Sequence, residues 1–144
     1  MLRRAIALAV PAGIVGRVTA ASAQAGDHRQ PIDAIFGRFA EAYGRNDAEG
    51  IAALFTEDGI LSTPGGPILV GRQAVAQNYG GRFGQGYGNI RFQIQHYDPD
   101  GLWAAGGYKV RLPQGSERNG NVTSIFRRQA DTLLIRVHTF NFYG

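Results

Sequence analysis

Residues 31–59, PIDAIFGRFAEAYGRNDAEGIAALFTEDG, decide the fold of this chain of 144 residues. Apolar residues in the first half of the stretch recur every three or four positions, so they share one face of a helix that begins at Pro31. Residues 44–46 interrupt this helix, and Asp47 caps a second one that ends at the turn 57–59. The predicted buried faces carry Ile32, Ile35, Phe36, Phe39 and Tyr43 in the first helix and Ile51, Leu54 and Phe55 in the second.

The next segment predicts a short hairpin and a third helix. Residues 60–62 and 68–70 are expected to be strands on either side of a Pro-Gly-Gly-Pro turn. A third helix is expected over 71–82, with Ala74, Val75 and Tyr79 facing inward. Residues 80–88 contain five glycines, so we expect a flexible connector there.

From residue 90 onward the sequence alternates between apolar and polar residues, which indicates an antiparallel sheet with one buried face. Strands are expected to begin at Ile90 and near Trp103, joined by the turn Asp98-Pro99-Asp100-Gly101. Two more strands are expected over 122–128 and 133–142. The predicted class is α+β, with three N-terminal helices packed on a mostly antiparallel sheet.

Met1 to Ala25 have the three parts of a secretory leader. Arg3 and Arg4 form the charged start, residues 5–16 are apolar, and Ala23-Gln24-Ala25 is an A-x-A cleavage signal before Gly26. The apolar part is too short to span a bilayer. We therefore expect a cleaved leader over 1–25 and one secreted or periplasmic domain over 26–144, with no membrane contact after cleavage.

Charge and composition exclude several classes of partner. Without the leader, 12 Lys and Arg face 11 Asp and Glu, so there is no electrostatic case for nucleic-acid binding. The chain has no cysteine and therefore no disulfide. The three histidines lack the spacing of metal ligands, and we expect neither a metal nor another cofactor.

The motifs of the N-terminal half resemble the SnoaL-like branch of the nuclear transport factor-like superfamily. The pattern consists of Phe39-x-x-x-Tyr43, Asn46-Asp47, Ile51-x-x-Leu54-Phe55-x-Glu57-Asp58-Gly59 and Gly71-Arg72-x-Ala74-Val75. The resemblance covers residues 32–142 and implies a cone, in which a strongly curved sheet wraps around the long helix. It also implies a pocket for a small, often apolar molecule at the open end of the cone.

The resemblance assigns no reaction, because the superfamily includes ketosteroid isomerase, cyclases, dehydratases, epoxide hydrolases and non-catalytic members. The base, the tyrosine and the buried acid of ketosteroid isomerase align with Thr63, Phe39 and Ser124, none of which keeps the required group. A second pocket tyrosine aligns with Tyr79. No acid is expected on an inward strand face, which argues against the Asp-Arg-Asp site of the epoxide hydrolases.

His138 is the best remaining candidate for acid–base chemistry, since relatives of this type often carry a histidine in the final strand. Strand alternation leaves its direction open, because a position on the outer or dimer face fits equally well. His96 shares the phase of Ile90 but lies beside a turn. Arg128 shares the phase of Phe126 and is able either to recognise a carboxylate or phenolate in the pocket or to reach solvent.

Three functions remain open. In the first, the domain binds a small apolar or aromatic molecule in a pocket lined by Phe39, Thr63, Tyr79, Tyr108, Ser124, Phe126, Arg128 and His138. In the second, an isomerase, cyclase or dehydratase uses a pocket histidine as base and Tyr79 or Tyr108 to polarise an oxygen. In the third, a non-catalytic module with a filled cone dimerises. We expect a homodimer through the outer sheet face, where Trp103 is exposed.

Overall fold

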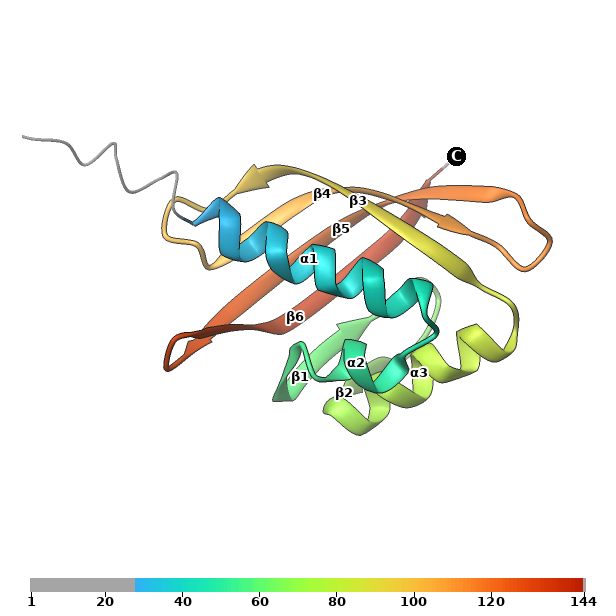
Figure 1. Cartoon of the computed structure of the whole chain (residues 1–144), viewed down its shortest axis with the longest axis horizontal. Coiled ribbons are helices and arrows are strands. Elements are labelled where there is room, and N and C mark those ends of the chain that lie inside the picture. The colour runs from blue at the N-terminus through green and yellow to red at the C-terminus, as the bar shows by residue number, and fades with distance from the viewer. Residues whose placement is uncertain (1–27, 144) are drawn as a thin grey trace, which may run out of the picture.

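The computed structural model describes residues 28–143, which form two helices, a short hairpin, a third helix and a long antiparallel meander (Figure 1). The helices are α1 (Arg29–Gly44), α2 (Ala48–Ala52) and α3 (Arg72–Gly84). The strands are β1 (Phe55–Ser62), β2 (Ile68–Val70), β3 (Gly88–Tyr97), β4 (Trp103–Arg111), β5 (Glu117–Gln129) and β6 (Thr132–Tyr143). The expected leader lies outside the described residues and stays a prediction.

One six-stranded sheet, in the order β2-β1-β6-β5-β4-β3, forms the wall of the molecule. Only the pair β1–β6 is parallel. The helices lie on the inner face of the curved sheet, with α1 crossing it and α2 and α3 closing one end (Figure 1). The structure thus has the predicted α+β architecture, a curved and mostly antiparallel sheet wrapped around the long helix.

The core lies between α1 and the sheet, as the helical periodicity predicts. The predicted inward residues of α1 are all buried, and Phe39 is completely so. Its ring packs edge-on against Tyr79 and Phe92, with centroid separations of 5.5 and 5.3 Å. Aromatic contacts of this kind add to the free energy gained by burial, so Phe39 joins α1, α3 and β3.

Three predicted boundaries are wrong. The second helix ends at Ala52, and β1 begins at Phe55 and runs through the expected turn at 57–59. Phe55 pairs with Ile135 of β6, so sheet pairing overrides the local helical pattern. The glycine-rich segment 80–88 is mostly ordered secondary structure, because α3 continues to Gly84 and β3 starts at Gly88. Finally, β5 begins at Glu117, before the strand expected over 122–128.

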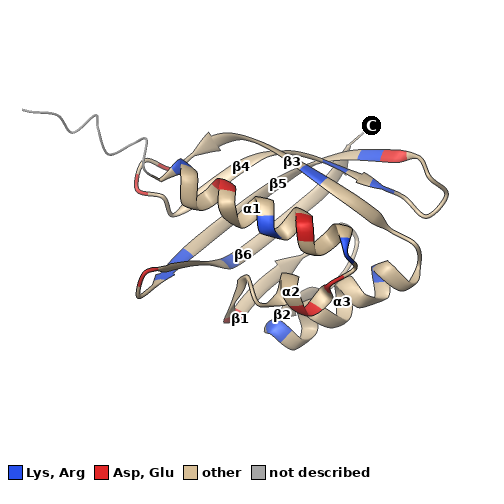
Figure 2. Ribbon diagram, viewed as in Figure 1, with Lys and Arg blue, Asp and Glu red and all other residues tan. Residues whose placement is uncertain are grey.

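Charged residues of both signs are distributed over the helices, the strands and the ends of the hairpins (Figure 2). Several form exposed ion pairs, such as Arg91 with Glu117 at 2.8 Å. Such surface pairs contribute little to stability. No helix among the described residues is long and apolar enough to cross a membrane.

Gly106 offers a test of how tightly β4 packs against β3. A Cβ atom at Gly106 would overlap with the carbonyl oxygen of Gln93, whereas at Gly107 the nearest atom is 3.7 Å away. We expect Gly106→Ala to lower the free energy of unfolding by about 1–3 kcal/mol, the usual cost of overpacking. Gly107→Ala is the control and should change it little. Urea denaturation of both variants measures the difference, and equal stabilities would contradict the packing described here.

Candidate functional site

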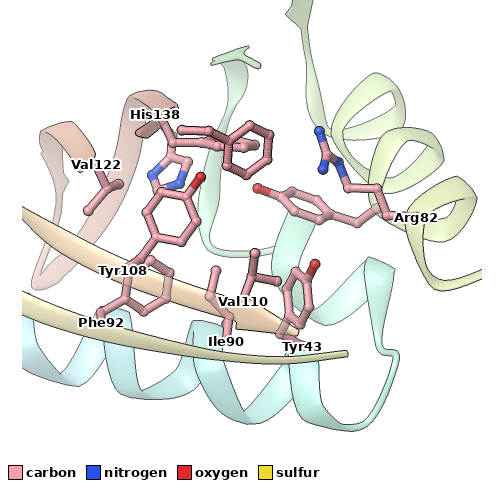
Figure 3. A pocket seen from close by; sticks show the side chains of 11 residues that line it. Tyr43, Arg82, Ile90, Phe92, Tyr108, Val110, Val122 and His138 are labelled. Carbon is pink, nitrogen blue, oxygen red and sulfur yellow. The ribbon is translucent and has the colours of Figure 1, made fainter. Parts of the chain in front are cut away.

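A narrow cavity lies between the inner face of the sheet and the helices α1 and α3 (Figure 3). Its volume is about 20 Å³, room for roughly one water molecule. Its lining is aromatic and aliphatic with few polar groups, which is the usual make-up of a small-molecule site. The lining residues are Tyr43, Tyr79, Arg82, Ile90, Phe92, Tyr108, Val110, Val122, His138, Phe140 and Phe142.

His138 reaches this cavity because β6 contains an extra residue. Ile125 of β5 pairs with Val137, but the next residue, Phe126, pairs with Ile135. Arg136 is therefore bulged, and the bulge changes which side of the strand faces inward. Ile135 is buried before it and His138 after it. Simple alternation would place these two side chains on opposite faces, which is why the sequence leaves the direction of His138 open.

The imidazole of His138 lies in an almost fully apolar environment. The side chain is 2% exposed, its ring stacks on Phe39 at 5.2 Å, and Phe55 approaches it edge-on at 6.1 Å. Its polar partner is Ser124, whose Oγ lies 2.7 Å from His138 Nδ1. Burial lowers the pKa of His138 to about 3, because the charged form loses its hydration. The ring is therefore neutral and only weakly basic near pH 7.

Three tyrosines bring hydroxyl groups to the cavity. Tyr79 packs edge-on against Tyr43 at 6.0 Å, and the hydroxyl of Tyr108 donates to the carbonyl oxygen of Asn141 at 2.9 Å. Burial raises the pKa of Tyr43 to about 12 and raises the pKa values of Tyr79 and Tyr108 as well. All three hydroxyls therefore stay protonated at physiological pH, and those of Tyr43 and Tyr79 are able to donate to a ligand, because the proton of Tyr108 is already donated to Asn141.

Arg82 completes the cavity and is the charged lining residue that the sequence analysis missed, along with several apolar ones. It lies in the last turn of α3, and its guanidinium stands over the rings of Tyr87 and Phe140 at 5.5 and 5.3 Å. Figure 3 shows it across the cavity from His138. Its position three residues after Tyr79 places both on one helix face. That spacing was the available signal, but the expected glycine-rich connector obscured it.

Several residues predicted for the pocket form its surroundings or lie elsewhere. Phe39 and Ser124 are fully buried behind His138, so they support the wall of the cavity. Phe126 is also buried but packs edge-on against Phe36 at 6.2 Å, outside the lining. Thr63 lies half-buried between β1 and β2, away from the cavity.

The two other titratable candidates are not in the cavity. His96 is exposed, because a bulge between Ile94 and His96 shifts it out of the phase of Ile90. Arg128 is also exposed, and its Nη2 lies 3.0 Å from Nδ1 of His28. Of its two predicted positions, Arg128 thus takes the one in solvent, and the cation of the cavity is Arg82.

The described residues contain no group of three His, Cys, Asp or Glu side chains placed to hold a metal ion. The cavity lining itself contains no carboxylate. What the site offers is a set of protonated donors in an apolar surround. Such a set is suited to holding an oxygen-bearing molecule in a fixed orientation.

Comparisons with known proteins agree with this architecture. Residues 36–137 match the model of the SnoaL-like domain family. The fold is similar to that of a ketosteroid isomerase-like protein from Erwinia carotovora atroseptica SCRI1043, with a TM-score of 0.66 at 20% identity, covering 80% of this chain and 95% of the other. No curated protein matches the sequence significantly.

Two further solved structures show the same fold. An NTF-2 like protein of unknown function from Shewanella oneidensis MR-1 has a TM-score of 0.67 at 15% identity, covering 78% of this chain and 97% of the other. ActVI-ORFA from Streptomyces coelicolor has a TM-score of 0.63 at 19% identity, covering 79% and 96%. At these identities the likeness concerns the fold alone.

The burial of His138 predicts a pH-dependent stability. Below its ordinary value of 6.5, the unfolded chain takes up a proton at this residue that the native protein does not. We therefore expect the free energy of unfolding to fall with decreasing pH, by up to about 1.4 kcal/mol per pH unit between roughly 6 and 3. The free energy of unfolding of His138→Gln, measured by denaturation at pH 5, 6 and 7, should therefore fall less with decreasing pH than that of the wild type. His96→Gln, at an exposed site, should keep it, and equal slopes in wild type and His138→Gln would contradict the assignment.

Proposed function

The chain belongs to the family of SnoaL-like domain proteins, and we propose that it uses its cavity to bind a small apolar or aromatic molecule. The observation that carries this proposal is the composition of the lining. Aromatic and aliphatic walls enclose three tyrosine hydroxyls, a neutral imidazole and one guanidinium. Apolar walls supply binding free energy by excluding water, and the few polar groups select the orientation of the ligand.

The electrostatics of the site support binding better than proton transfer. An isomerase, cyclase or dehydratase would need a base whose pKa lies near the working pH. His138 faces inward as such an enzyme requires, but its pKa of about 3 makes it a poor base. The lining offers no carboxylate in its place. The polar groups are thus better suited to holding an oxygen atom than to moving a proton.

Side chains fill most of the cone and leave only a small cavity. Phe39 and Tyr79 meet at its centre, whereas Phe126 packs toward Phe36 and stays outside the lining. The half-buried side chains of Phe140 and Phe142 line the cavity toward its mouth. Because the cavity is narrow, a ligand has to be small and flat or has to displace these two rings.

We expect matched ligands to stabilise the protein, since ligand at about 100 times its Kd adds roughly 2.7 kcal/mol to the free energy of unfolding. A thermal-shift screen with aromatic carboxylates, phenols, steroids and fatty acids measures the effect as a rise in Tm. Phe142→Ala should enlarge the rise, because it removes a ring that a ligand has to displace. Tyr143→Ala is the control, since this neighbour lies on the outer face and is 54% exposed. No rise with any class would contradict the proposal.

We also propose that two copies pair through the outer face of the sheet. An apolar row crosses five strands there, in which Trp103 pairs with Ile125, Ile125 with Val137, Val137 with Ile60, and Ile60 with Val70. We call these five residues the outer row. Trp103, Ile125 and Val70 are 40, 45 and 61% exposed. A row of this kind is self-complementary about a two-fold axis, so a second copy of the chain is a fitting partner.

Ile125→Glu should convert the dimer to a monomer, because an unpaired carboxylate in a buried apolar interface is strongly unfavourable. Analytical ultracentrifugation measures the mass of the wild type and the variant at the same concentrations. Asn121→Glu is the control, since Asn121 lies on the same strand and face but outside the outer row. A wild type that sediments as a monomer at all concentrations would contradict the proposed pairing.

A further inference from the structure

Arg82 carries the only full charge among the residues that line the cavity, because His138 is neutral there. None of the ion pairs found among residues 28–143 includes it. Its Nε atom has no accessible surface and no hydrogen-bond partner among the described residues. Leaving a donor of a charged group buried without an acceptor is costly. The protein thus holds a cation and a free donor in the wall of the cavity with no acid to match them.

The aromatic contacts of Arg82 and its place in α3 explain only part of its burial in the cavity wall. The rings of Tyr87 and Phe140 hold the guanidinium by cation–π contact, and a cation in the last turn of α3 is favourable with respect to the helix dipole. Neither contact satisfies Nε. Tyr87 and Phe140 explain where the guanidinium lies, but they provide no anion to balance its charge.

The hydroxyls of Tyr43 and Tyr79 are further donors in the lining, whereas the proton of Tyr108 is donated to the carbonyl oxygen of Asn141. The positive charge of Arg82 lowers the pKa of each of these tyrosines, against the larger effect of burial. The guanidinium and the hydroxyls of Tyr43 and Tyr79 line the same cavity. A space surrounded by donors and lined by no acid is complementary to a group that only accepts hydrogen bonds, and a carboxylate is such a group.

We propose that the ligand of this cavity is a carboxylate on a small apolar or aromatic body, and that Arg82 is the residue that selects it. This inference rests on the proposed binding function and names the chemical class of the ligand. The planar guanidinium offers two parallel donors to the two carboxylate oxygens. The apolar body then lies against Val122 and the rings of the lining.

Matched pairs of ligands test the inference directly. We would measure by calorimetry at pH 7 the affinity for 2-naphthoate against 2-naphthamide, and for octanoate against octanamide. Each pair keeps the apolar body and changes only the charge. The wild type should bind the acid about 10- to 100-fold more tightly than the amide, as expected for a charge-assisted hydrogen bond in a shielded site.

Variants assign this preference to Arg82. Arg82→Met keeps the length of the side chain and removes the charge, so it should abolish the preference for the acid and leave the affinity for the amide almost unchanged. Arg82→Lys keeps a charge but loses the planar pair of donors, and it should retain only part of the preference. Arg38→Met, at an exposed position of α1, is the control and should behave like the wild type.

The outcomes separate the two proposals. Equal binding of acid and amide by the wild type would overturn the carboxylate inference and leave the binding function in place. No binding of either member of both pairs would overturn both. A full preference for the acid in Arg82→Met would overturn the role of Arg82. If circular dichroism shows that Arg82→Met does not fold, Arg82→Lys decides in the same way, since an unchanged preference there would also contradict recognition by the guanidinium fork.

Discussion

A single extra residue in β6 determines which side chains of the longest hairpin reach the interior. Arg136 is bulged between Ile135 and Val137, and the guanidinium on its outer side donates from Nη1 to the carbonyl oxygen of Asp58 at 2.8 Å. The parallel pairing of β1 with β6 is irregular in the same region, because Phe55 pairs with Ile135 but Ile60 with Val137. The bulge is therefore tied to both neighbouring strands. Without it, the alternation of β6 would turn His138 away from the interior.

The position of His138 has a consequence for its chemistry. A histidine inside an apolar cone loses its charge unless an acid accompanies it, and here its neighbours are the hydroxyl of Ser124 and the rings of Phe39 and Phe55. The resemblance to ketosteroid isomerase places Phe39 and Ser124 at the positions of its tyrosine and its buried acid. The structure brings these two residues together on either side of the imidazole. The centre of the cone is thus a neutral, packed unit that supports the cavity wall.

The sequence predicts those parts of the fold in which local pattern and tertiary packing agree. The face of α1 and the inward side of β4, which carries Tyr108, follow the helical and strand periods. The start of β1 could not be predicted from the local pattern around Phe55, which is helical. The pairing of Phe55 with Ile135 of β6, a residue distant in sequence, makes it a strand. Arg82 was missed for a related reason. The glycines around it favour a loop, but the packing of Tyr79 and Phe83 against Tyr43 extends α3 past them.

The cavity is polarised along its depth, and this limits how a ligand lies in it. Val122 and His138 are 1 and 2% exposed, whereas Arg82 and Phe140 are half-buried and closer to solvent. The desolvation cost of a guanidinium is smaller where water is near than at the centre of the cone. The deep end is apolar, and the histidine there is neutral. The charged group of the cavity therefore lies toward the mouth, where burying it costs least, and the interior end is lined by apolar and neutral side chains.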